Sequence, residues 1–207
     1  MSDLSSTLVA LERNFYDRDT ATVARELIGM HLIRETRAGR VRGRIVETEA
    51  YLPREDSACH AARGKTPRNA SMFGKPGIAY VYAIHSRWCF NVVTESRGVP
   101  AAVLIRALEP LEGLSAMEER RGLTRMLDLA RGPARLCEAF EIDRRLDGWD
   151  LTQQQRLWIA RAESDVKESP DIVVTRRIGV TSAQDLLLRF ACRENSFVSG
   201  PKNWASR

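Results

Sequence analysis

Two strand–turn–strand patterns, followed by an apolar strand, most restrict what this 207-residue chain can fold into. HLIRE and VRGRIVETEAY flank a turn around Ala38 and Gly39, and GIAYVYAI and WCFNVVT flank the tripeptide His85-Ser86-Arg87. Each pair predicts an antiparallel hairpin, because a short turn between two strands reverses the chain direction. The mostly apolar segment AAVLIRALEP predicts a further strand that lies in the centre of the sheet.

Helical patterns flank these strands. DTATVARELIGM predicts a short helix that Asp19 or Thr20 can cap and Gly29 can end. Residues 113–122 and 134–141 predict two more helices. DIVVTRRI and LLLRFACRE predict the last two strands. Hairpins with flanking helices are typical of an α+β fold around a mainly antiparallel sheet.

Length and composition fit one ordinary globular domain, which we place over residues 1–207, with flexible termini at about 1–15 and 200–207. The apolar fraction of 43% is sufficient for a core. No apolar run is long enough to cross a membrane, and the N-terminus has no basic start followed by an apolar stretch. We therefore expect no secretion signal, no membrane contact and a cytoplasmic protein, in the nucleoid if the source is a prokaryote.

Four scattered cysteines form no CxxC pair, so we expect no structural zinc site. We interpret the adjacent Cys59 and His60 as loop residues without a metal, since any further ligands would have to be distant. A chain of this size in the cytosol would keep its thiols reduced.

The charge balance weakly favours a polyanionic partner. The net charge is +5, from 32 basic and 27 acidic residues, and the isoelectric point is about 9.3. An irregular stretch that runs to about Pro76 is long enough to be a functional loop. It carries five cations against two acids, and charge alone leaves phosphate contact and an ordinary solvated loop equally open. These charged residues are Arg54, Arg63, Lys65, Arg68 and Lys75, opposed by Glu55 and Asp56.

Charged and aromatic side chains interrupt the predicted strands. Side chains alternate along a strand, so Glu47, Glu49 and Tyr51 share one face. Arg106 lies inside the apolar run VLIRAL, where a buried charge needs a carboxylate or a phosphate as partner. The structural alternative is an Arg–Glu pair that only holds two strands together.

Tyr80 and Tyr82 also share a face, in the second hairpin. Taken singly, each tyrosine fits ordinary strand packing, because aromatic residues favour strands. Taken with the carboxylates, the arginine and the histidine, they predict one concave site. Aromatic faces stack on nucleic-acid bases with roughly 1–3 kcal/mol per contact, and a carboxylate among them can take a proton from water.

Longer motifs carry a resemblance to a known family. They are GRIVETEAY, EDSACHAARGKTPRN, MFGKPGIAYVY, CFNVV, LIRALEPLEG, RGPARLC and RIGV, in this order from about residue 20 to residue 200. The chain resembles the 3-methyladenine (alkyladenine) DNA glycosylases of the monomeric α+β type. That resemblance implies a curved sheet with a protruding hairpin, and a monomer that binds damaged double-stranded DNA. It also implies a monofunctional enzyme that uses no metal and no cofactor.

The resemblance further implies roles for individual residues. Glu49, the Glu before Ala-Tyr in VETEAY, is expected to be the general base, and Arg106 to help position the attacking water. The backbone carbonyl of Ile178 is expected to hold the same water, and Asn91 to crowd the amino group of normal guanine. The side chains that the resemblance expects to clasp the flipped base are Tyr51, His60 and Tyr82, and we add Tyr80 because it shares the face of Tyr82. The tip residues His85 and Arg87 are expected to contact DNA, and the charge of the loop adds Arg63, Lys65 and Arg68.

The second hairpin departs from the family pattern at its tip. Most members carry a large aromatic residue and then Gly-Met, whereas the tip His85-Ser86-Arg87 is one residue shorter. In the family this tip enters the minor groove and fills the gap that the flipped base leaves. We expect His85 or Arg87 to do so here.

Two other functions remain open on the residues alone. A nucleic-acid-binding module without catalysis explains the charge and the tyrosines, but it gives Glu49 no role. A carbohydrate glycosidase could use Glu47 and Glu49, which lie about 6.6 Å apart along a strand, near the inverting separation of roughly 6.5–9.5 Å. Neighbours on one strand would, however, lie side by side rather than flank a bond.

Overall fold

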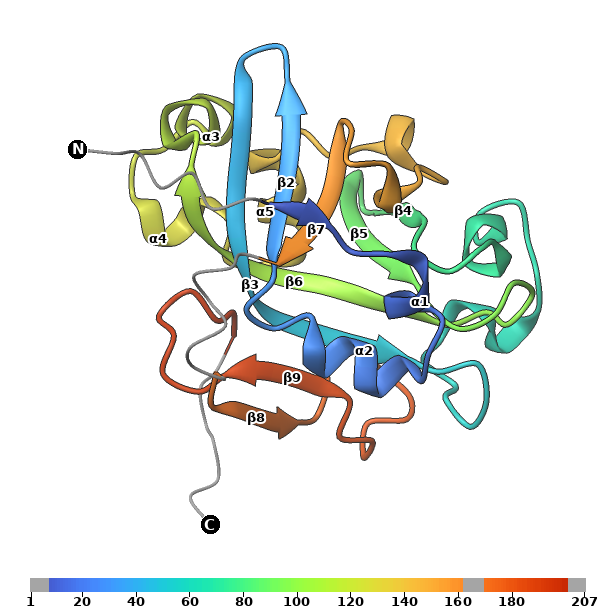
Figure 1. The fold of residues 1–207 in the computed structure, drawn as a ribbon. Coiled ribbons are helices and arrows are strands. Elements are labelled where there is room, and N and C mark those ends of the chain that lie inside the picture. Colours follow the sequence, from blue (N-terminus) through green and yellow to red (C-terminus); the bar gives the residue numbers. More distant parts are fainter. Residues whose placement is uncertain (1–7, 162–169, 201–207) are drawn as a thin grey trace.

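The computed structural model describes residues 8–161 and 170–200, which form one curled antiparallel sheet with short helices around it (Figure 1). The strand order is β1-β7-β2-β3-β6-β5-β4, with β9 on β3 and β8 on β9. The strands are β1 (Val9–Ala10), β2 (His31–Thr36), β3 (Gly39–Tyr51), β4 (Ala79–Ile84), β5 (Arg87–Val93), β6 (Ala102–Glu112), β7 (Leu157–Arg161), β8 (Ile172–Thr175) and β9 (Arg189–Cys192). The α-helices are α1 (Arg13–Tyr16), α2 (Thr20–Glu26), α3 (Leu114–Arg121), α4 (Met126–Leu129) and α5 (Pro133–Ala139). The 3-10 turns are η1 (His60–Arg63), η2 (Ala70–Phe73), η3 (Arg144–Leu146) and η4 (Leu151–Gln153).

Both predicted hairpins are confirmed. β2 pairs with β3, and β4 pairs with β5. The second connection is shorter than the predicted tripeptide, because Arg87 already pairs with Ile84 as the first residue of β5. The turn therefore consists of His85 and Ser86, with φ of 46° and 66°. Positive φ at both positions is what a two-residue type I′ hairpin turn requires.

The long strand β3 organises the sheet. One of its edges pairs first with β2 and then with β9, and the other edge pairs with β6. The β3–β6 register shifts on both sides of Glu47, where Arg106 is left opposite no residue of β3. Bulges of this kind bend a strand and increase its twist. The bend curls the sheet, and the predicted central position of β6, between β3 and β5, is confirmed.

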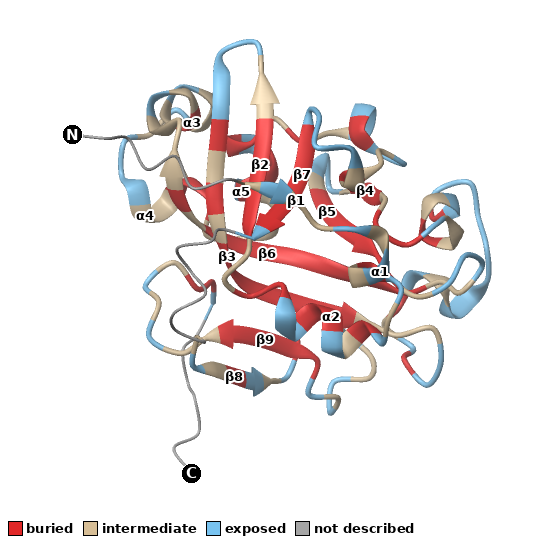
Figure 2. Cartoon of the chain, in the orientation of Figure 1, coloured by how far each residue is buried: buried red, intermediate tan, exposed pale blue. Residues whose placement is uncertain are grey.

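Among the described residues, four apolar clusters lie on the sheet, and the two with the most members position the site. The larger one joins the sheet to α2 and α5, and the buried strands that contribute to it are red in Figure 2. The smaller one lies beneath the loop that contains η1 and η2. Its buried members are Cys59, Met72, Tyr80, Tyr82, Cys89, Val93, Ala102 and Leu104. The second cluster shares a face of the sheet with the predicted site residues.

The predicted helices agree with α2, α3 and α5, and the Asp19 side chain caps α2 by accepting from the Thr22 N–H at 2.8 Å. The strand predicted at DIVVTRRI is shorter than expected, because residues 176–188 form neither helix nor strand. β1 and most of α1 lie within the stretch for which flexibility is expected, and β1 pairs with β7. The rest of those termini, 1–7 and 201–207, lies outside the described residues. Within residues 8–161 and 170–200 no helix combines the length and apolar character needed to cross a membrane.

Candidate active site

Strand register gathers the predicted residues on one face of the sheet. Glu49 of β3 is opposite Leu104 of β6, Leu104 is opposite Asn91 of β5, and Asn91 is opposite Tyr80 of β4. These four side chains therefore form one row across four strands. At about 4.8 Å per strand, the Cα atoms at the two ends of the row lie roughly 14 Å apart. The row joins a carboxylate at one end to an aromatic group at the other.

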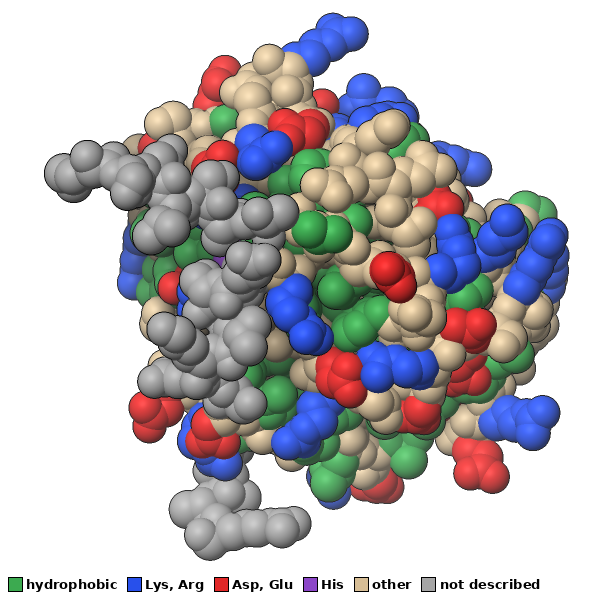
Figure 3. All heavy atoms as spheres, in the orientation of Figure 1, with side chains coloured by type: hydrophobic (Ala, Val, Ile, Leu, Met, Phe, Trp, Pro, Cys, Tyr) green, Lys and Arg blue, Asp and Glu red, His purple; other side chains and the backbone are tan. Residues whose placement is uncertain are grey.

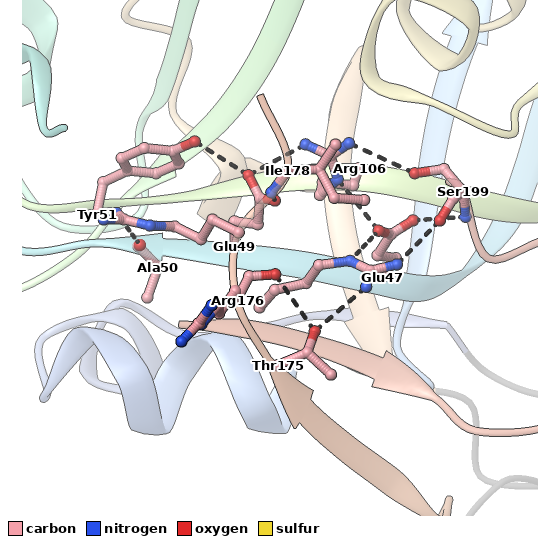
Figure 4. Close-up of polar contacts among 11 residues, drawn as sticks. Glu47, Glu49, Ala50, Tyr51, Arg106, Thr175, Arg176, Ile178 and Ser199 are labelled. Atoms are coloured by element: carbon pink, nitrogen blue, oxygen red, sulfur yellow. Dashed lines mark hydrogen bonds and ion pairs between the residues drawn. The ribbon is translucent and has the colours of Figure 1, made fainter. Parts of the chain in front are cut away.

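The carboxylate of Glu49 is fully buried and held by three donors. Oε1 accepts from the Ile178 N–H at 2.7 Å, and Oε2 accepts from the Tyr51 hydroxyl at 3.0 Å. Oε2 also lies 3.1 Å from Nη1 of Arg106 (Figure 4). Donors on both oxygens fix the orientation of the carboxylate. Ile178 contacts Glu49 through its backbone N–H. The expected role of its backbone carbonyl, which is to hold the attacking water, remains a prediction.

Glu47 is equally buried but has different partners. Its Oε1 accepts from Nε of Arg106 at 3.1 Å and from Nε of Arg189 at 2.6 Å. Its Oε2 accepts from the Ser199 N–H at 2.7 Å. Glu47 thus joins β3 to β6, to β9 and to the C-terminal segment. The strand-linking Arg–Glu pair is present, and it coexists with the contact between Arg106 and Glu49.

Burial and charge determine the protonation of the groups around Glu49. Burial lowers the pKa of Arg106, but Glu49 and Glu47 more than offset this, and the net pKa is raised. Burial, and then the charge of Glu49, raise the pKa of Tyr51 well above its ordinary value. Arg106 is therefore charged and Tyr51 is a neutral hydroxyl donor at neutral pH.

His60, Tyr80 and Tyr82 form the aromatic end of the row. Nδ1 of His60 lies 2.9 Å from the Tyr80 hydroxyl, and the His60 ring meets the Tyr82 ring edge-on at 4.4 Å between centroids. The two tyrosine rings stack at 5.2 Å. Burial and the charge of Arg68 lower the pKa of His60, so its ring is neutral at neutral pH.

Asn69 holds the loop that delivers His60. Its Oδ1 accepts from the Thr66 N–H at 2.7 Å, and its Nδ2 donates to the carbonyls of His60 and Gly64 at 3.0 Å each. Asn69 itself is buried. Asn69, in the segment TPRN, therefore holds the loop closed. The cations around this segment in the sequence do not indicate that structural role.

The cations of this loop have different surroundings. Arg68 donates to the Ala83 carbonyl, and its guanidinium lies 6.0 Å from the Tyr82 ring. Lys65 lies 5.5 Å from the Phe73 ring. Lys and Arg side chains gather at the right edge of Figure 3, over the loop that contains η1 and η2. All four cysteines are free thiols, and the described part of the chain contains no cluster of His, Cys, Asp or Glu suited to a metal.

The hairpin tip lies apart from the buried carboxylates and contacts α5. Nη1 of Arg87 is 3.7 Å from Oε2 of Glu138, which also accepts from Arg121. Ile84, opposite Arg87, has 43% of its surface exposed. The tip thus presents an exposed apolar side chain beside His85, while Arg87 extends toward the helix.

An arginine-rich surface continues from the tip over α3, α4 and α5. Three arginines lie within 3.5 Å of Asp128. Two more lie within 3.7 Å of Glu138, so five arginines face two carboxylates. The five are Arg87, Arg121, Arg125, Arg131 and Arg135. The run RRGLTRMLDLARGPAR contains four of them, and their density is the signal in the sequence that could have pointed to this surface.

Three further charged residues belong to the buried site, although the sequence patterns do not single them out. They are Asp56, Arg177 and Arg189. With Glu47, Glu49 and Arg106 they make three carboxylates and three guanidinium groups, so the site is balanced in charge. Arg189 follows the apolar run LLL, and a charge within a predicted strand is the one clue that it offers.

Comparisons with known proteins identify the family. A family model described as methylpurine-DNA glycosylase (MPG) matches residues 14–196. The chain belongs to the methylpurine-DNA glycosylase family. The predicted resemblance is therefore confirmed, as is the prediction of an enzyme that hydrolyses N-glycosyl bonds. Membership in this enzyme family excludes the two alternative functions, a binding module without catalysis and a carbohydrate glycosidase.

Curated relatives of this family member are provisionally named 3-methyladenine DNA glycosylases. One from Carboxydothermus hydrogenoformans is 47% identical over 190 residues, which cover 91% of this chain and 98% of the relative. One from Mesorhizobium japonicum is 48% identical over 186 residues, 89% of this chain and 88% of the relative. One from Methanocella arvoryzae is 49% identical over 181 residues, 86% of this chain and 88% of the relative.

Proposed function

We propose that this glycosylase flips alkylated or deaminated purines out of duplex DNA and hydrolyses their N-glycosidic bond with a water that Glu49 activates. The substrates that we propose are 3-methyladenine, 7-methylguanine, ethenoadenine and hypoxanthine. The observation that carries the proposal is the row that joins buried Glu49 to the aromatic group of Tyr80, Tyr82 and His60. Removal of the base would start base excision repair by a single-domain monomer.

The chemistry follows from this arrangement. A glycosidic bond inside the base stack is out of reach, so the nucleotide has to be extruded. Glu49 takes a proton from water while the water oxygen attacks C1′ of the sugar, and the base leaves with the bonding electrons. Arg106, which already lies 3.1 Å from Glu49, and the Ile178 carbonyl would orient this water. A positioned base contributes roughly 10²–10⁴-fold to such a step.

Aromatic and neutral walls suit a damaged purine that carries a positive charge. The faces of Tyr51 and Tyr82 attract a cation through their ring electrons. His60 is neutral at neutral pH, because burial and Arg68 lower its pKa, and a neutral ring does not repel a cationic base. Once its bond to the sugar breaks, the cationic base leaves as a neutral molecule, which favours departure.

We assign phosphate contacts to two basic regions beside the site. One is the loop with Arg63, Lys65 and Arg68, although Arg68 also holds the second hairpin. The other is the arginine-rich surface over α3, α4 and α5. Both would bind the DNA backbone and not the bases, so they are expected to weaken together as salt increases.

The proposal is tested on duplex oligonucleotides that each contain one of the four lesions. The free base is separated from DNA and quantified under single-turnover conditions, with an undamaged duplex as control. Release from at least one lesion duplex and none from the undamaged duplex is expected. No release from any lesion would contradict the proposed substrates.

The enzyme is expected to leave the DNA strand intact. No lysine stands at the position of Glu49 or Tyr51, and the described residues around Glu49 offer no amine that could attack the sugar. Borohydride added during the reaction should therefore trap no covalent adduct, and the product should be an intact abasic strand. A trapped protein–DNA adduct would indicate a Schiff base and a second activity.

Asn91 is expected to exclude guanine by crowding its exocyclic amino group. The side chain is buried in the row, and its Nδ2 donates to the Tyr80 carbonyl at 3.0 Å. Asn91→Ser should then gain activity on guanine-derived bases, with little loss on 3-methyladenine. The rates on both substrates are measured side by side. A uniform loss on every substrate would instead make Asn91 a residue that only holds β5 to β4.

The hairpin tip is expected to offset the unstacking of one base, which costs a few kcal/mol per step. His85 offers a small ring and Arg87 a guanidinium, and we propose that they share this task. Flipping would then be supported less than with a large aromatic residue, so lesions that are already mispaired should be favoured. His85→Tyr should help a paired lesion most, and Arg87→Ala should harm it most.

Single-turnover release from a paired and a mispaired lesion measures this effect. The contact between Arg87 and Glu138 supplies a control, because Glu138→Gln frees Arg87 without removing it. If neither tip substitution changes the ratio between the two lesions, His85 and Arg87 are not the wedge. The exposed Ile84 is then the next residue to substitute.

A further inference from the structure

Asp56 and Arg177 form a second buried ion pair beside Glu49. Nη1 and Nη2 of Arg177 each donate to a different carboxylate oxygen of Asp56 at 2.6 Å, and neither side chain has any exposed surface. Such two-pronged pairs are directional as well as strong. The Asp56 carboxylate also accepts from the backbone N–H groups of Leu52 and Ala58, at 3.0 and 3.2 Å. The pair is therefore anchored to the chain that leaves β3.

Arg177 also contacts the two residues that follow Glu49. Nη1 donates to the Ala50 carbonyl at 3.0 Å, and the guanidinium lies 4.7 Å from the centre of the Tyr51 ring. A cation at this distance from an aromatic face is attracted to it. Because the Tyr51 hydroxyl donates to Glu49, Arg177 supports one of the donors that hold the carboxylate.

The next residue along the chain supplies another donor. Ile178 places its N–H on Oε1 of Glu49 (Figure 4). It belongs to residues 176–188, which form neither helix nor strand, so no ladder of backbone hydrogen bonds fixes its position. The side chain of Arg177 is the buried anchor of this segment beside Ile178. Arg177 thus links two donors of Glu49, the Tyr51 hydroxyl and the Ile178 N–H, to the carboxylate of Asp56.

We propose that Asp56 and Arg177 form a positioning clamp for the catalytic carboxylate. The clamp fixes the Ile178 N–H and the Tyr51 hydroxyl, and through them the direction in which Glu49 meets the attacking water. This inference rests on the proposed role of Glu49 as the base. Asp56 and Arg177 are positioning residues, because they contact Ala50, Tyr51 and the surrounding backbone and not the reacting atoms.

The test measures single-turnover base release at saturating enzyme, together with binding of the lesion duplex. Arg177→Gln should slow release by about 100-fold, as a small misplacement of a catalytic group can, and should change binding little. Arg177→Lys should recover part of the rate, because it keeps the charge but loses the two-pronged geometry. Arg176→Gln is the matched control. It removes the same charge from the same segment, where Arg176 is exposed and paired with the exposed Asp185, and it should keep the wild-type rate.

The pH–rate profile separates positioning from a purely structural role. The charged and titratable groups around Glu49 are Tyr51 and Glu47 on β3, Arg106 on β6, Cys89 on β5, Arg189 on β9 and Arg177 itself. Loss of the Ile178 donor would disfavour the charged form of the carboxylate. The acid limb of the profile should therefore move to higher pH in Arg177→Gln. A purely structural role would lower the melting temperature but leave the profile and the rate per folded molecule unchanged.

The double variant Asp56→Asn/Arg177→Gln keeps the test decisive if the single variants fold poorly. It leaves no unpaired buried charge at this pair, and it should show the same slow release and the same shifted limb. A folded double variant with wild-type rate and profile would overturn the clamp. Glu49→Gln, measured in parallel, distinguishes the two claims. If Glu49→Gln retains activity, the proposed base fails and the clamp with it, whereas an inactive Glu49→Gln beside a fully active double variant overturns the clamp alone.

Discussion

Glu49→Gln is expected to abolish base release while lesion binding is largely kept. The substitution removes the group that takes the proton from water, which contributes roughly 10²–10⁴-fold to the rate. It keeps the shape of the side chain, and the amide oxygen can still accept from Ile178 or from Tyr51. Arg106 keeps its other carboxylate partner, Glu47, at 3.1 Å. Single-turnover release and duplex binding, measured on one lesion duplex, check the two parts of this expectation.

A loss of binding equal to the loss of rate would contradict it. In that case Glu49 would hold the flipped nucleotide or the protein fold, and the proton would go elsewhere. The melting temperature of the variant is the control, since only a folded variant can report on chemistry.

Glu47→Gln is expected to have its main effect on stability. Its carboxylate is the buried partner of two guanidinium groups, those of Arg106 and Arg189. Removing one partner from a buried ion-pair network costs about 3–5 kcal/mol. Unfolding in urea should show this decrease in the free energy of unfolding, while activity per folded molecule falls far less than in Glu49→Gln.

The exposed pair Arg18–Glu26 provides the matched comparison. Nη2 of Arg18 lies 2.7 Å from Oε2 of Glu26, a distance close to the 2.6 Å between Arg189 and Glu47. The side chains of Arg18 and Glu26 are, however, 37% and 43% exposed. Water screens such a pair, so Glu26→Gln should cost less than about 1 kcal/mol. Equal costs at Glu26 and Glu47 would mean that burial does not strengthen the contribution of Glu47.

Local patterns were sufficient to predict much of the fold. The hairpins, α2 and the central position of β6 depend on alternation, on turn residues and on a helix cap, and these act between neighbours in the sequence. The common face of Glu47, Glu49 and Tyr51 follows from the same alternation, and Arg106 does meet both carboxylates. The alternation of side chains along a strand is therefore sufficient to locate the site on the sheet.

Contacts between distant parts of the chain could not be predicted in this way. β7 is five residues long and is defined by its pairing with β2, more than 120 residues earlier in the chain. The difference between Glu47 and Glu49 is of the same kind, because it depends on Ser199 for one and on Ile178 for the other. The sequence places both acids on one strand face and does not reveal which of them is held by two buried arginines.

The hairpin tip shows how a turn changes the assignment of a residue. A tripeptide connection would place Arg87 inside the turn. A two-residue turn with positive φ at His85 and Ser86 places Arg87 at the start of β5, within reach of Glu138. Turn length depends on backbone conformations that His and Ser adopt less readily than Gly or Asn, so the sequence favours no particular register.

The central claim is that Glu49, and not Glu47, takes the proton from the attacking water. The most direct test compares wild type, Glu49→Gln and Glu47→Gln for single-turnover release of the base from one lesion duplex, with each rate divided by the folded fraction. We expect release by the wild type, no detectable release by Glu49→Gln, and release by Glu47→Gln at a rate much nearer to that of the wild type. Equal losses at the two positions would contradict the assignment of the base.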